Sequence, residues 1–180
     1  KKMDRSYSTL LDFSRFTAAM LVFFHHAEQV LKDKGLSIIA SFGHDAVIFF
    51  FLLSGFVIGY VADSREKSLF AYFVARIARL YSVAIPSIML VILLCSIGMT
   101  LFPGAYERLS VSDWVSIAAV SAFFLGQSTL FSVSVPTNGP YWSINYEAWY
   151  YIIFGAFFYL RGYKRTLFVL LAMVIAGVKI

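Results

Sequence analysis

The chain has 180 residues, of which 60% are hydrophobic and 18% are aromatic, and its formal net charge is +5. A soluble domain of this length has too little interior to bury so much apolar surface, which excludes an ordinary soluble fold. Its Lys and Arg residues stand in short clusters between apolar runs, a pattern typical of membrane topology signals rather than of a nucleic-acid-binding surface. The single cysteine excludes an intramolecular disulfide, and we expect no metal site. We therefore expect an all-α, multi-pass integral membrane helical bundle.

The first apolar run, residues 10–31, is long enough to cross a bilayer, yet it contains several ionisable side chains. Such groups are costly inside a membrane and therefore suggest a function. Arg15 and His26 are eleven residues apart, which puts them on nearly the same helix face, about 16.5 Å apart along the axis. The imidazole of His26 suits a general base, or else a packing residue. His25 points about 100° away, toward the face of Glu28, and is expected to be a structural partner of Glu28 or of the outer rim.

Further apolar runs follow along the chain. They cover residues 45–62, 82–102, 114–131, 142–160 and 166–178, and the last is too short to span a membrane comfortably. Within the second run, the G-x-x-x-G step of Gly55 and Gly59 predicts close helix packing or, alternatively, direct contact with a substrate.

A basic segment at residues 69–81 precedes the run 82–102 and is expected to be an interfacial or helix-entry segment. Arg76 and Arg79 share one helix face with Tyr72 in this segment. Guanidinium groups bind phosphate oxygens well, and they equally anchor a helix to anionic lipid. Their spacing alone leaves both interpretations open.

The run 114–131 decides the topology, because serines, Gly126 and Gln127 interrupt it. If it spans the membrane, the Lys and Arg residues divide almost evenly between the two sides. If it is re-entrant or lies at the outer interface, ten of them lie on the N-terminal side and three on the opposite side. The positive-inside rule favours this second version, with a cytoplasmic N-terminus.

This topology predicts that the candidate functional side chains lie at two depths in the membrane, one near the outer side and one near the cytoplasmic side. His26 and Glu147 each lie five residues, about 7.5 Å, from the outer ends of their helices. A His–carboxylate pair can orient the ring and stabilise an imidazolium, although a structural polar network uses the same residue types. Arg15, Arg76 and Arg79 belong to the cytoplasmic side. The arrangement suits a donor with a phosphorylated head and a long arm, such as acyl-coenzyme A.

Four motifs resemble those of the membrane acyltransferase-3 family, and they occur in the family's order. They are the R-X10-H spacing from Arg15 to His26, the run FFFLLSGFVI, the R-x-x-R pair of Arg76 and Arg79, and the segment WSINYEAWYYIIF. The resemblance covers essentially the whole chain. Ala148 stands where a second acid often follows the position of Glu147, so a mechanism that needs both acids is excluded.

The resemblance implies an O-acyltransferase that moves an acyl group, commonly acetyl, from cytoplasmic acetyl-CoA to a hydroxyl of an extracytoplasmic carbohydrate such as a cell-surface polysaccharide. It implies catalytic roles for His26 and Glu147, and binding of the acyl-CoA by Arg15, Arg76 and Arg79. The expected partners are the lipid bilayer and the two substrates, without nucleic acid. The expected location is the inner or cell membrane of a bacterium.

Domains of this family usually have about ten membrane helices, which is more than 180 residues supply. Residues 1–180 are therefore expected to be the N-terminal portion of a single membrane acyltransferase domain, incomplete at the C-terminus. The residues leave two alternatives. One is a proton-coupled transporter, in which the intramembrane His, Glu and Arg side chains form a relay, and the other is an inactive truncated membrane subunit.

Overall fold

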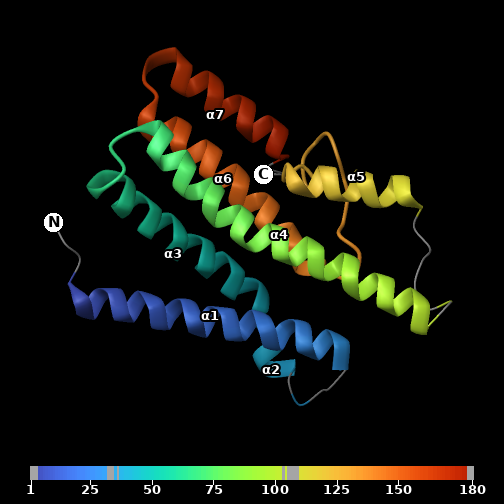
Figure 1. Ribbon diagram of the computed structural model, residues 1–180. Coiled ribbons are helices and arrows are strands. Elements are labelled where there is room, and N and C mark those ends of the chain that lie inside the picture. The colour runs from blue at the N-terminus through green and yellow to red at the C-terminus, as the bar shows by residue number, and fades with distance from the viewer. Residues whose placement is uncertain (1–3, 32–34, 36, 103, 105–109, 178–180) are drawn as a thin grey trace. The chain divides into compact units, whose positions relative to one another are not determined.

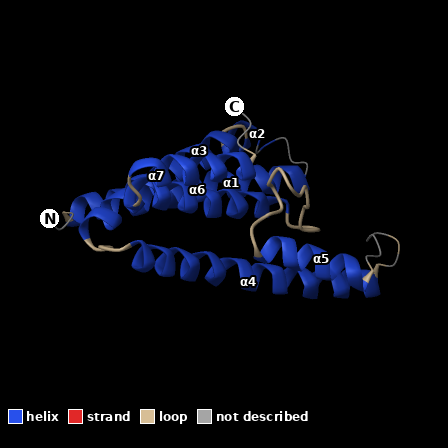
Figure 2. Cartoon of the chain, turned by 90° about the horizontal axis from the view of Figure 1, so that it is seen from above, coloured by secondary structure: helices blue, strands red, loops and turns tan. Residues whose placement is uncertain are grey.

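The computed structural model describes residues 4–31, 35, 37–102, 104 and 110–177 (Figure 1). Most of these residues are helical, and the described part of the chain contains no strand, only one isolated bridge between Gln127 and Ser132 (Figure 2). The chain divides into two compact units, Lys1–Lys67 and Ser68–Ile180. The expected all-α class is confirmed for the described residues.

Two antiparallel helices, α1 (Arg5–Leu31) and α3 (Gly43–Ser64), build the first unit, and the short α2 (Ser37–Ala40) comes between them in the sequence (Figure 1). The α3 helix extends the predicted run by two residues at each end. The prediction of close helix packing at Gly55 is wrong for the described residues, since a Cβ at this position would meet no atom within 4 Å. The close approach occurs at Gly43 instead, where a Cβ would lie 2.3 Å from the Cβ of His25.

The second unit begins with α4 (Leu69–Leu101), a helix of 33 residues and about 50 Å. Residues 69–81, expected to be an interfacial or helix-entry segment, form the first turns of α4. The predicted start of an apolar run at residue 82 is therefore not a helix boundary, and α4 continues through Pro86. The Ser68 side chain caps its start by accepting a hydrogen bond from the backbone N–H of Ala71 (3.2 Å). By length and composition, α3 and α4 are both suited to cross a membrane.

The run 114–131 does not form a spanning helix. The α5 helix (Val111–Ala122) has 12 residues, about 18 Å, against a hydrocarbon core of about 30 Å. Three aromatic side chains donate hydrogen bonds to the carbonyls at its end: Tyr141 to Ser121 (3.1 Å), Tyr81 to Ala122 (2.8 Å) and the Trp149 indole to Phe124 (3.2 Å). Broken backbone at membrane depth needs such partners, so these bonds favour the re-entrant or interfacial version.

After the 3-10 turn η2 (Gly139–Tyr141), two helices complete the second unit, α6 (Trp142–Tyr159) and α7 (Gly162–Ala176) (Figure 1). The α6 helix runs antiparallel to α4, because the rings of Tyr72 and Tyr159 lie 5.5 Å apart while Asn138 bonds Ser87 further along α4. The basic cluster at residues 161–165 thus lies at the same end of this unit as the start of α4. That is the arrangement that the charge count favoured.

Candidate active site

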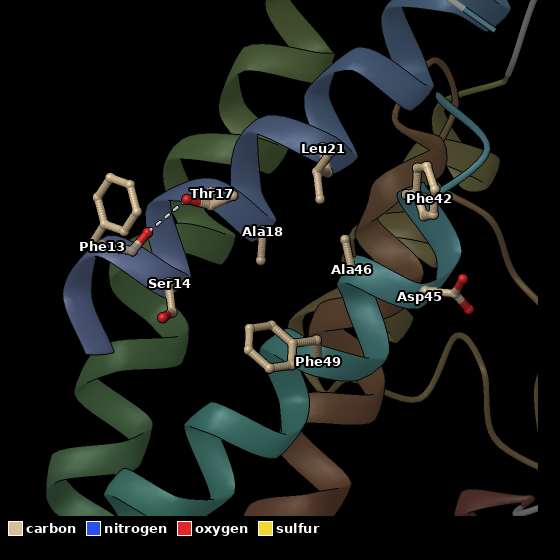
Figure 3. A pocket seen from close by; sticks show the side chains of 9 residues that line it. All are labelled: Phe13, Ser14, Thr17, Ala18, Leu21, Phe42, Asp45, Ala46 and Phe49. Atoms are coloured by element: carbon tan, nitrogen blue, oxygen red, sulfur yellow. Dashed lines mark hydrogen bonds between the residues drawn. The ribbon is translucent and has the colours of Figure 1, made fainter. Parts of the chain in front are cut away.

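One side of α1 packs against α3 and leaves another side for Arg15 and His26. The residues that face α3 form a stripe: Ser14, Ala18, Leu21 and His25. The first three help to line a groove of about 390 Å³, across which Ala18 and Leu21 face Ala46 and Phe49 of α3 (Figure 3). Arg15 and His26 each follow a stripe residue by one position, so both are turned by about 100° from the packed side. Because α1 is continuous, their predicted common face is confirmed.

The two neighbouring histidines have different surroundings. His25 donates from Nδ1 to the carbonyl of Ala40 (2.8 Å), and its Nε2 accepts from the amide of Gln29 (3.0 Å). The prediction that His25 is a partner of Glu28 is therefore wrong, while the prediction of a structural role for His25 is supported. No described residue hydrogen-bonds the ring of His26, whose centroid lies 5.4 Å from that of His25. Neither ring nitrogen of His26 is therefore occupied by a described residue, and both can take part in proton transfer.

Arg15 lies half-buried on the same face as His26. Its Nε is inaccessible to solvent and has no hydrogen-bond partner among the described residues. A buried guanidinium nitrogen normally has an acceptor, so this atom is a place where a polar ligand can bind.

In the second unit, an ion pair joins α4 to α6. Arg79 Nε donates to Glu147 Oε1 at 3.1 Å, and the Tyr151 hydroxyl donates to the same oxygen. The Arg79 side chain is 44% exposed and that of Glu147 is 19% exposed. Both described bonds go to Oε1, so Oε2 remains available to a further donor. A cavity of about 240 Å³ opens beside the pair, bounded by Leu80 and Val83.

Arg76 lies one turn before this ion pair, between two tyrosine rings. Its guanidinium carbon is 5.1 Å from the ring centroid of Tyr72 and 5.7 Å from that of Tyr151. Both distances fall within the range of a favourable cation–π interaction. The Tyr72 hydroxyl in turn donates to the backbone carbonyl of Tyr151 (3.1 Å), which holds the Tyr72 side chain against the backbone of α6. The predicted shared face of Tyr72, Arg76 and Arg79 is confirmed.

The predicted separation in depth between Glu147 and the R-x-x-R pair is wrong. Arg79 bonds Glu147 directly, so the two residues lie at one level of the second unit. The reason is that residue 79 lies about 15 Å along a continuous α4 rather than at its entrance. His26 and Arg15 belong to the first unit and Glu147 to the second, and the pairing of His26 with Glu147 stays a prediction.

Each unit carries side chains of kinds that acyl transfer can use. One face of α1 carries a disengaged imidazole and a buried guanidinium, and α4 with α6 carries two guanidinium groups and a carboxylate. A profile of the acyltransferase 3 domain, described as an acyltransferase domain, matches residues 9–178. The chain belongs to the acyltransferase 3 family. It is an integral membrane protein of a family of membrane acyltransferases, which use an acyl donor and an acceptor. No curated protein and no solved structure matches it.

The contacts in this acyltransferase that sequence reasoning missed are those that hold the candidate groups in place. Tyr151 follows Glu147 by one helical turn, a spacing that could have indicated its hydrogen bond. Tyr72 is fully buried and supports Arg76 through its ring. Gly43 allows His25 to pack closely against α3. The two residues are separated by the connection between α1 and α3, and no local sequence pattern indicates that they meet.

Proposed function

We propose that this acyltransferase moves an acetyl group from cytoplasmic acetyl-CoA to a hydroxyl of a carbohydrate on the outer side of the membrane, such as a cell-surface polysaccharide. The proposed location is the inner or cell membrane of a bacterium. The observation that carries the proposal is the ion pair of Arg79 with Glu147. This ion pair joins the R-x-x-R motif to the segment WSINYEAWYYIIF, which is distant from it in the sequence. Both residues of the pair line the same cavity.

In the proposed reaction, His26 takes the proton of the acceptor hydroxyl while the acceptor oxygen forms an ester bond to the acyl carbon. The carbon–sulfur bond of the thioester breaks, and coenzyme A leaves as the thiol after protonation. If His26 first accepts the acyl group itself, the overall balance of atoms is the same. Glu147 contributes negative charge that stabilises the cationic form of the catalytic group. The ring of His26 has no hydrogen-bond partner in the described part of the chain, which supports this role.

Arg76 and Arg79 are proposed to hold the phosphates of the donor, and Arg15 is proposed to line the path of its arm. A guanidinium has five N–H donors, and the described contact with Glu147 uses only the Nε of Arg79. The remaining N–H groups suit bidentate binding of phosphate oxygens. The Nε of Arg15, for which the described residues supply no partner, supports a polar ligand at that position.

The reaction is tested by supplying radiolabelled acetyl-CoA to the cytoplasmic face of membranes that contain the protein. We expect label in extracytoplasmic glycan, in an amount that rises with the amount of protein. Absence of label in glycan, while the donor remains intact and the protein is folded, would contradict the proposed function.

Donor binding is tested separately with Arg76→Ala and Arg79→Ala in a direct acetyl-CoA binding assay. Each variant should weaken binding by about tenfold, because each removes a charge-assisted contact to phosphate. Arg165→Ala is the matched control, since Arg165 stacks on Phe157 at 5.5 Å in the same unit. If all three variants bind acetyl-CoA as tightly as the unsubstituted protein, Arg76 and Arg79 would be assigned to lipid anchoring instead.

A further inference from the structure

A polar cavity lies at the start of α6, away from the Arg79–Glu147 pair. It measures about 180 Å³, and Gln127, Ser134, Tyr141, Trp142 and Asn145 contribute to its wall. The volume is several times the roughly 30 Å³ of one water molecule in the liquid, so a single structural water does not fill it. The cavity therefore has room for a small polar group of a ligand.

Asn145 in this wall has a buried polar atom whose hydrogen bonding is incomplete. The residue is 2% exposed, and its Oδ1 is buried without a hydrogen-bond partner among the described residues. Buried carbonyl oxygens are normally paired, because an unpaired one loses its interaction with water and gains nothing. Asn138, at the same end of the unit, shows the usual state, since its amide donates to the Ser87 hydroxyl at 2.8 Å.

The position of the cavity separates it from the candidate donor site. Asn145 and Glu147 are two residues apart on α6, so they point about 160° apart around the helix axis. The cavity also lies at the start of α6, whereas the basic cluster at residues 161–165 follows its end, about 27 Å away. In the proposed orientation, with the basic end cytoplasmic, the cavity faces the outer side.

We propose that the Asn145 cavity binds a hydroxyl-rich ligand and is a subsite for the carbohydrate acceptor, an assignment that rests on the proposed function. A sugar hydroxyl supplies the donor that Oδ1 lacks. The indole of Trp142 offers an apolar face for the C–H side of a sugar ring, with polar groups around it. Asn145 is a binding residue in this proposal and takes no part in bond making.

The proposal is tested by titrating the protein in nanodiscs with methyl glycosides of glucose, galactose, mannose and N-acetylglucosamine, followed by intrinsic tryptophan fluorescence. We expect at least one glycoside to bind, and a Trp142→Phe variant to lose the signal. Asn145→Leu should weaken that binding by about tenfold. It should not lower stability, because it removes an unpaired polar atom. Asn138→Ala, the matched control, should lower stability and leave glycoside affinity unchanged.

Absence of binding for all four glycosides, or equal affinity in Asn145→Leu, would overturn the subsite. The acetyl-transfer assay distinguishes the two proposals. Transfer with an unchanged acceptor KM in Asn145→Leu would refute the subsite and leave the proposed function standing. Glycoside binding that depends on Asn145, without any acetyl transfer, would refute the proposed function and leave a carbohydrate site.

Discussion

The ion pair between Arg79 and Glu147 makes a quantitative prediction about the second unit. Its two atoms lie 3.1 Å apart, and the exposed fractions of the two side chains are 44% and 19%. Fully exposed pairs contribute about 0.2–1 kcal/mol, whereas loss of one partner from a fully buried pair costs about 3–5 kcal/mol. This pair lies between those limits, so we expect a coupling free energy of about 1–2 kcal/mol.

The measurement is a double-mutant cycle of Arg79→Gln and Glu147→Gln, with unfolding followed by SDS titration in mixed micelles. The glutamine variants keep much of the side-chain volume and remove the charges. Arg165→Gln combined with Glu147→Gln is the matched control, and this second cycle should show no coupling. Additive effects of Arg79→Gln and Glu147→Gln would refute the inference that α4 and α6 are joined by this contact.

Three further predictions concern packing, pH and topology. Gly43→Ala should destabilise the first unit by about 1–3 kcal/mol, measured by the same titration, because the added carbon would meet the Cβ of His25; an unchanged midpoint would contradict that packing. Hydrogen bonds from the side chain and backbone of Ser110 lower the pKa of Asp113, so the cap of α5 should be complete above about pH 4 and be lost as the pH falls through the lowered pKa. Asp113→Asn should remove that pH dependence of thermal stability, and a variant that keeps it would point to another group. A cysteine replacing Lys164 should be protected from an impermeant thiol reagent in intact cells, and rapid labelling would contradict the cytoplasmic placement.

Most of the helices could be predicted from the sequence, because apolar length and polar interruptions are local properties. The runs 45–62 and 142–160 became α3 and α6 with small shifts at their ends. The common face of Arg15 and His26 also followed from helix geometry alone. The interruption of 114–131 indicated that this segment does not span, and the short α5 agrees with that.

The errors arose where the answer depends on contacts between helices. A proline usually marks a helix end or its first turn, so Pro86 suggested a boundary that α4 does not have. That false boundary put Arg79 at a membrane surface and away from Glu147. The pairing of α4 with α6 is a non-local contact, and no periodicity within either helix specifies it.

The identity of the catalytic histidine is the central claim, and a comparison of His26→Ala with His25→Ala in the acetyl-transfer assay tests it most directly. We expect His26→Ala to lose acetyl transfer by at least about a hundredfold, with unchanged stability and unchanged acetyl-CoA binding. His25→Ala should retain catalysis in its folded fraction and lower stability, because it removes the hydrogen bonds to Ala40 and Gln29. Undiminished transfer by His26→Ala would contradict the account.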